Sequence, residues 1–208
     1  MQFEIVIEGL TKDAWVGNLS PEKVKNAARM SLNRVAARAR TKSDRALREQ
    51  IAFPARYLGP AAKRLWIQQK ASNNNLEAII RGQGRPTSLA RFSGRQRPPA
   101  PGRGQRGGGV NVTVKPGQRK FINRAFLIRL RNNNTGLAVR TAGGKPANAF
   151  KPKEIGRNLY LLYGPSVDQA LLDARNEGGI YEEISQEMLD EWDREFERLL
   201  NVEMNRAG

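Results

Sequence analysis

The sequence predicts an α+β fold in which a mixed or antiparallel sheet packs against a long N-terminal helix and a C-terminal amphipathic helix. Three observations predict it: apolar residues at helical spacing near both ends, short segments in which apolar and polar residues alternate, and one Gly/Pro/Arg-rich segment. A chain of 208 residues is long enough for one core. We therefore expect a single domain over residues 1–208, with residues 93–109 as a flexible basic loop that protrudes from it.

Both helices are indicated by their apolar stripes. Ser20 followed by Pro21 is typical of an N-cap and a first helical position, and the periodic pattern continues to about residue 50. The first stripe consists of Val24, Ala28, Leu32, Val35 and Ala39. The stripe of the terminal helix consists of Ile180, Ile184, Met188, Trp192, Phe196 and Leu199.

The strands are predicted by alternation between turn signals. Residues 3–7 form a first strand that Gly9 ends, and residues 64–68 and 76–80 flank an Asn-rich turn. Further strands at residues 110–114, 125–131 and 137–141 are predicted to form a meander, with a hairpin loop at residues 132–136. A second basic loop is expected at residues 143–157, and a short helix is expected to end at Leu172.

The segment 93–109 has an unusual composition. Six Gly and three Pro in 17 residues predict a loop without a packed element, and its four Arg add charge to it.

Charge is distributed unevenly along the chain. Residues 1–77 hold 14 basic and 7 acidic residues, residues 78–153 hold 17 basic and no acidic residues, and residues 154–208 hold 5 basic and 13 acidic residues. A carboxylate-free stretch of this length attracts polyanions. The acidic C-terminal third either folds back on basic residues of its own chain or meets those of a neighbouring copy, and the sequence leaves both readings open.

The composition disfavours catalysis. The chain has no Cys and no His, which removes the usual zinc, iron–sulfur and haem ligands and the Ser-His-Asp triad. Carboxylates at four-residue spacing on the terminal helix are more typical of a solvated helix face than of a metal or acid–base site. We therefore expect no enzyme, no catalytic residue, no metal and no cofactor.

The expected location is the cytoplasm in which the chain is made, with no membrane contact. No apolar run reaches the roughly 20 residues that a membrane-spanning helix needs, and residues 1–4 do not resemble a secretory signal.

The aromatic residues Trp66, Phe92 and Tyr163 are expected in the core and not as base-stacking groups. No nucleic-acid-binding module is recognisable, so the basic segment is expected to contact phosphates without reading sequence.

Five segments stand out along the chain: SLNRVAARART at residues 31–41, RPTSLARF at 85–92, VTVKPG at 112–117 with the strands and hairpin that follow it, LYGPSV at 162–167, and EFERLL at 195–200. Together they resemble the minor tail protein Z family, which comprises tail-completion or neck proteins of lambda-like siphophages and prophages. The resemblance runs from about residue 21 to residue 200.

The resemblance implies a structural virion protein at the phage head–tail junction, which completes the tail and joins it to the head as a subunit of an oligomeric ring around the DNA path. Implied partners are copies of the same chain, other neck and tail proteins (terminator, tail tube and head-completion proteins), and phage DNA held transiently by charge. The alternative is a non-specific nucleic-acid-binding protein that uses the Arg/Gly-rich middle.

Candidate residues follow from these expectations. The best candidates for facing DNA or another polyanion are Arg95, Arg97, Arg103 and Arg106, followed by Arg81, Arg85 and Arg91. Ring contacts are hypothesised to pair Glu187, Asp190 and Glu191 with a basic face of the adjacent copy.

Overall fold

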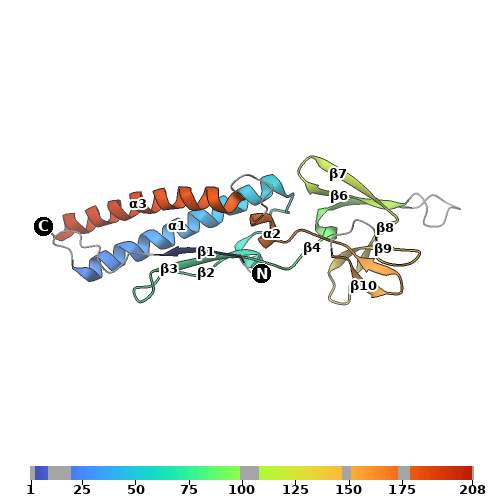
Figure 1. The fold of residues 1–208 in the computed structure, drawn as a ribbon, viewed down its shortest axis with the longest axis horizontal. Coiled ribbons are helices and arrows are strands. Elements are labelled where there is room, and N and C mark those ends of the chain that lie inside the picture. Colours follow the sequence, from blue (N-terminus) through green and yellow to red (C-terminus); the bar gives the residue numbers. More distant parts are fainter. Residues whose placement is uncertain (1–2, 9–19, 99–107, 147–150, 173–178, 208) are drawn as a thin grey trace. The chain divides into compact units, whose positions relative to one another are not determined.

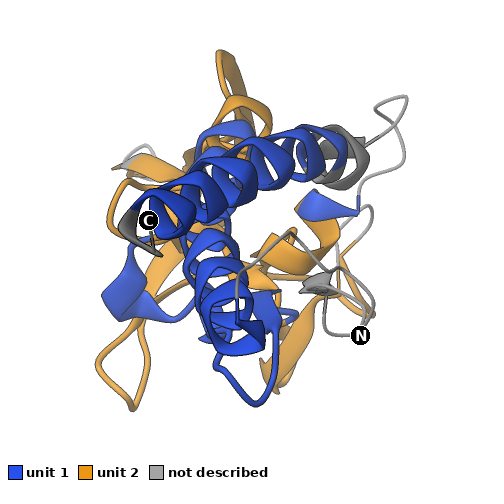
Figure 2. Ribbon diagram, turned by 90° about the vertical axis from the view of Figure 1, so that its left-hand side faces the viewer, with its two compact units in different colours: residues 1–46, 59–84, 171–208 blue, residues 47–58, 85–170 orange. Residues whose placement is uncertain are grey.

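The computed structural model describes residues 3–8, 20–98, 108–146, 151–172 and 179–207. The chain divides into two compact units, which Figure 2 shows in different colours. Unit 1 comprises residues 1–46, 59–84 and 171–208, and unit 2 comprises residues 47–58 and 85–170. The predicted α+β class is confirmed. The prediction of a single domain stays a prediction.

Unit 1 is built on two long helices that run in opposite directions, α1 (Pro21–Gln50, whose last four residues belong to unit 2) and α3 (Gly179–Ala207). The predicted start of α1 is confirmed, because the Ser20 carbonyl accepts hydrogen bonds from the N–H groups of Lys23 and Val24. The predicted stripe of α1 is confirmed too, since Leu32, Val35 and Ala39 are fully buried.

The sheet of unit 1 has the order β1-β3-β2 and is antiparallel throughout. Its strands are β1 (Phe3–Glu8), β2 (Leu65–Gln69) and β3 (Glu77–Gly82), which confirms the three strands predicted here. A 3-10 turn, η1 (Pro60–Ala62), precedes β2. Figure 1 shows α1 between this sheet and α3. The Asn33 side chain ties α1 to the segment before β3, since it donates to the Ala71 carbonyl and accepts from the Ala71 N–H, both at 2.9 Å.

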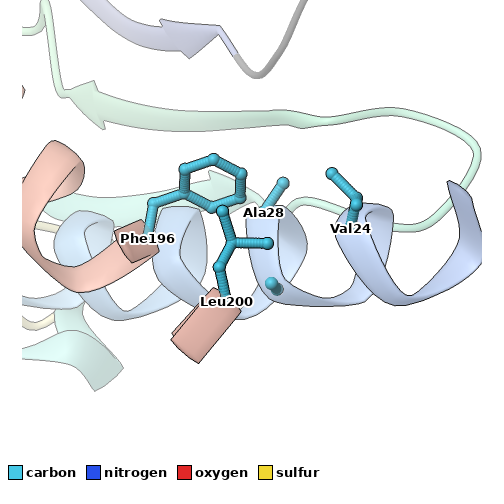
Figure 3. Close-up of a cluster of buried hydrophobic side chains, with 5 residues drawn as sticks. Val24, Ala28, Phe196 and Leu200 are labelled. Atoms are coloured by element: carbon cyan, nitrogen blue, oxygen red, sulfur yellow. The ribbon is translucent and has the colours of Figure 1, made fainter. Parts of the chain in front are cut away.

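The contact between α1 and α3 contains a cluster of buried apolar side chains. Phe196 and Leu200 of α3 pack with Val24, Ala27 and Ala28 of α1, and Figure 3 shows four of the five by name. The small alanines let the α3 side chains approach the α1 backbone. Trp192, half-buried, stacks on Phe196 with ring centroids 5.2 Å apart.

Unit 2 is mainly β-structure in three antiparallel sheets, with the orders β5-β6-β7, β10-β11-β9-β8 and β12-β4 among the described residues. Its strands are β4 (Thr87–Ser88), β5 (Ser93–Arg97), β6 (Gly109–Lys115), β7 (Gln118–Asn123), β8 (Ala125–Arg129), β9 (Thr135–Arg140), β10 (Lys153–Gly156), β11 (Leu159–Leu161) and β12 (Tyr163–Gly164). A 3-10 turn, η2 (Leu89–Phe92), lies between β4 and β5, and the short helix α2 (Val167–Leu171) follows β12.

The core of unit 2 joins strands of two sheets. Val110 and Val112 of β6 pack with Ala125 of β8, Leu137 of β9 and Leu162. The predicted short helix is present as α2, and it begins with a capping box: Ser166 Oγ accepts from the Gln169 N–H at 3.0 Å, while the Gln169 side chain accepts from the Ser166 N–H at 3.2 Å.

The strand order corrects the predicted meander. The β8–β9 hairpin is confirmed, with Asn133 in the left-handed region at its tip, but β6 pairs with β5 and β7 and not with β8. The reason is the turn at Pro116 and Gly117. Proline fixes φ at the first turn position and Gly117 supplies the positive φ of 74° at the second, so the chain reverses at once and returns as β7.

Two predicted loops are also shorter than expected. Ser93–Arg97 is strand β5 and Gly109 begins β6, so that only residues 98–108 connect them, and residues 99–107 lie outside the described residues. Lys153–Gly156, placed by prediction in a loop, forms the edge strand β10. In both cases pairing with a neighbouring strand outweighs a local sequence of low strand propensity.

Candidate nucleic-acid interface

The two units differ sharply in charge. Unit 1 holds 17 basic and 17 acidic residues, so its net charge is zero. Unit 2 holds 19 basic and three acidic residues, so it carries the whole net charge of +16. The positive field of the chain is therefore concentrated on unit 2.

The cations of unit 2 face solvent. Every basic residue between residues 85 and 157 whose side chain is described is exposed. The three acidic residues of the unit, Glu49, Glu154 and Asp168, lie outside the sheet β5-β6-β7, and Asp168 is buried. This sheet thus carries Arg97, Lys115, Arg119 and Lys120 with no carboxylate in any of its strands.

The predicted polyanion-facing residues fall in different places. Arg85, Arg91 and Arg97 are exposed in unit 2, whereas Arg81 lies on the central strand of the unit 1 sheet, in register with Glu4 and Trp66. Arg103 and Arg106 lie outside the described residues, as does the side chain of Arg95.

Arg91 has a packing role as well as a charge. Its guanidinium carbon lies 5.9 Å from the centroid of the Tyr57 ring, and Tyr57 stacks on Phe53 with centroids 5.4 Å apart. Phe92 is buried beside Phe53, which confirms its expected place in the core, while Trp66 and Tyr163 are half-buried.

The acidic helix α3 finds its counter-charges on α1. Arg34 pairs with Glu195 at 2.6 Å, Arg38 pairs with Glu191, and Lys42 pairs with Glu187. From one pair to the next, the residue number on α1 rises by four and the residue number on α3 falls by four, as expected for antiparallel helices. We call these three pairs the ion ladder. The sequence left open whether the acidic C-terminal third meets basic residues of its own chain or those of a neighbouring copy. In the structure, these acidic residues of α3 pair with basic residues of α1 in the same chain.

Glu195 is the most strongly stabilised carboxylate of the ion ladder. Hydrogen bonds from Arg198 and then Arg34 lower the pKa of Glu195 from its usual value of 4.5 to about 2, although burial opposes this shift. A carboxyl whose folded pKa is depressed stabilises the fold above its unfolded pKa, and this stabilisation is lost as the pH falls from about 4.5 to about 2.

Glu195→Gln is therefore expected to lower the free energy of unfolding of unit 1 by about 1–2 kcal/mol at pH 7. In this variant the free energy of unfolding is also expected to fall less steeply between about pH 5 and pH 2. Tryptophan fluorescence during urea unfolding measures this, because the three Trp of the chain all lie in unit 1. Glu197→Gln, an exposed neighbour on α3, serves as the control. An unchanged acid slope in Glu195→Gln would contradict the assignment.

Sequence reasoning missed the hairpin formed by β6 and β7. Lys115, Arg119 and Lys120 are exposed on it, and Phe121 is 43% exposed. The sequence did contain an indication of this hairpin, namely the Pro116–Gly117 turn between two segments that can form strands.

No group of three or more potential metal-ligating acidic side chains occurs among the residues that the structure describes. Within the same residues, no helix has the length and apolarity that crossing a membrane requires.

Comparison with known families places the chain among the structural proteins of phage tails, and hence in the virion. The family is prophage minor tail protein Z (GPZ): its model matches residues 14–206, and the chain belongs to this family. The match spans both units, and the resemblance drawn from short sequence segments is confirmed. No curated protein and no solved structure matches the chain.

Proposed function

We propose that the chain acts at the phage head–tail junction, where it completes the tail and joins it to the head as one subunit of an oligomeric ring around the DNA path. The observation that carries this proposal is the separation of charge, with zero net charge on unit 1 and +16 on unit 2. An electroneutral helical unit suits packing against protein neighbours. A unit with so few carboxylates suits a position beside the phosphates of DNA.

The chemistry in this proposal is non-covalent. Arginine and lysine side chains hold DNA transiently by charge, with release of counterions and without reading its sequence. The chain has no catalytic role, and its partners are its own copies, the terminator, the tail tube and head-completion proteins. It gathers in the host cytoplasm during assembly and then remains in the tail.

Ring contacts through the acidic face of α3 are part of the proposal. Asp190 is exposed and lies between Glu187 and Glu191, which take part in the ion ladder. A half-exposed carboxylate such as Glu187 can share its charge between α1 of its own chain and a basic face of the adjacent copy.

The triple change Glu187→Gln, Asp190→Asn and Glu191→Gln is expected to convert rings into smaller species, as measured by negative-stain microscopy and sedimentation velocity. The double change Asp193→Asn and Glu197→Gln is the matched control, because both carboxylates are exposed on α3 and lie outside the proposed ring contacts, so rings are expected to stay intact in it. Intact rings in the triple variant would rule out these contacts. A wild-type chain that stays monomeric, also beside tail tubes, would overturn the proposed function.

A second candidate is a non-specific nucleic-acid-binding protein. The exposed cations on the strands of unit 2 favour it. Rings that form without nucleic acid support the junction role, whereas a monomer that binds duplex DNA with steep salt dependence supports the second candidate.

A further inference from the structure

The sheet β5-β6-β7 has two unlike faces. On one face, Val110, Val112 and Ile122 belong to the packed core of unit 2. On the other, register places Arg97, Gly109 and Asn123 in one row across the three strands, and Asn111 opposite Phe121 in the next row. Arg119 shares this face, because it precedes Phe121 by two positions on β7. We call the second face the outer face.

Phe121 is the centre of the outer face, and its place depends on Gly109. A side chain at position 109 would stand 2.5 Å from Cζ and 2.8 Å from Cε2 of Phe121, so the ring occupies the space that this glycine leaves empty. The ring therefore lies over the backbone of β6, and the residue is still 43% exposed.

The groups around the ring are those that hold a nucleotide strand. Arg97 and Arg119 supply positive charge on two sides, and Asn111 and Asn123 supply amide donors and acceptors. No strand of the sheet carries a carboxylate. An exposed apolar residue is by itself ordinary, but a phenyl ring on a sheet face between cations and amides has the composition of a base-stacking platform.

We propose that the outer face binds single-stranded nucleic acid, with one base stacked on Phe121 and flanking phosphates held by Arg97 and Arg119. The base faces of a duplex are covered by their neighbours, so only an unpaired strand can present a base to this ring. Charge complementarity favours a nucleic-acid strand as the ligand, because unit 2, which contains this sheet, has a net charge of +16. The inference rests on the proposed contact with DNA and names the form of DNA that one face recognises.

The test compares binding of a fluorescein-labelled oligothymidylate and of a duplex of equal length, by fluorescence anisotropy at low salt. Phe121→Leu keeps an apolar side chain and removes the ring. It is expected to bind the oligothymidylate about 5- to 150-fold more weakly, since stacking contributes roughly 1–3 kcal/mol per base. Duplex affinity is expected to stay within about twofold, since phosphate contacts dominate it.

Two control variants accompany it. Phe121→Tyr keeps the ring and is expected to bind the oligothymidylate like the wild type. Ile155→Ala removes the other large apolar side chain of unit 2 that is strongly exposed among the described residues, and it is expected to leave both affinities unchanged.

Three results would overturn the inference: wild-type binding by Phe121→Leu, an equal loss for both ligands in that variant, or no binding of the oligothymidylate by the wild-type chain. Sedimentation of the same samples reports ring formation separately. If Phe121→Leu forms rings and binds the oligothymidylate as the wild type does, the base-stacking site is contradicted and the junction role is not. If the wild-type chain stays monomeric but binds the oligothymidylate through Phe121, the junction role is contradicted and the base-stacking site is not.

Discussion

Phe196→Ala is expected to lower the free energy of unfolding of unit 1 by about 3–4 kcal/mol and to release the C-terminal part of α3 from α1. Loss of a buried phenyl side chain costs about 3–5 kcal/mol, because apolar contact is lost and a cavity remains. Phe196 is 8% exposed, packs on Ala28 and Val24, and carries the stacked ring of Trp192. The two alanines of α1 in this cluster have too little volume to fill the space that remains.

Urea unfolding followed by tryptophan fluorescence measures this effect. Leu189→Ala is the matched control, since Leu189 lies on the same helix and is 54% exposed. This change is expected to alter stability by less than about 0.5 kcal/mol. Equal unfolding midpoints for Phe196→Ala and Leu189→Ala would show that this cluster does not hold α3.

The release of α3 also has an electrostatic consequence. The ion ladder neutralises Arg34, Arg38 and Lys42, so a displaced α3 leaves these cations of α1 without their carboxylates. The partly exposed pairs of Glu191 and Glu187 contribute little individually, about 0–1 kcal/mol each, which is less than the contribution of the buried Glu195. Apolar packing therefore sets the stability of the helix pair, while the ladder sets its register and cancels the charge of unit 1.

Gly109→Ala is expected to destabilise unit 2 by about 2–3 kcal/mol and to displace the ring of Phe121. An added Cβ would lie 2.4 Å from the carbonyl oxygen of Ile122, which is backbone of the paired strand and has little freedom to move. Relief of this overlap requires β6 and β7 to separate locally, at a cost of the order found for overpacked sites, about 1–3 kcal/mol.

Hydrogen–deuterium exchange measured by mass spectrometry can follow this change in unit 2 alone. Faster exchange is expected in β6 and β7 of Gly109→Ala, with unit 1 unaffected. Gly143→Ala is the control, because an added Cβ at that position meets no atom within 4 Å. Protection of β6 and β7 at the wild-type level in Gly109→Ala would contradict the close approach of the two strands.

Sequence patterns predicted the helices best. The start of α1 follows from Ser20 and Pro21 and its length from the periodic pattern that begins with the stripe Val24 to Ala39, while the stripe of α3 holds to Leu199. The periodicity of a long segment rests on many residues, so one residue that departs from the pattern does not change the prediction. The short strands β5, β7 and β10 escaped prediction because residues of low strand propensity are held there by partners distant in sequence.

The candidate site was predicted only in part. A basic middle segment was evident, and exposed Arg85, Arg91 and Arg97 lie in the cationic unit. Phe121 and the outer face could not be recognised from the sequence, because the sequence does not fix the register of β7. A change of register by one residue would place Phe121 on the core face of the sheet. The register depends on the Pro116–Gly117 turn and on Gly109, whose empty side-chain position becomes visible only in the paired strands.

By itself, the sequence determined the α+β class, both long helices and the likeness to minor tail protein Z, since each depends on order and spacing along the chain. Only the tertiary structure decided that one unit is electroneutral while the other carries the whole charge of +16. The physical reason is that Coulomb interactions act through space: α3 lies 145 or more positions from its partners on α1 in the chain, yet its carboxylates meet their cations across a helix pair.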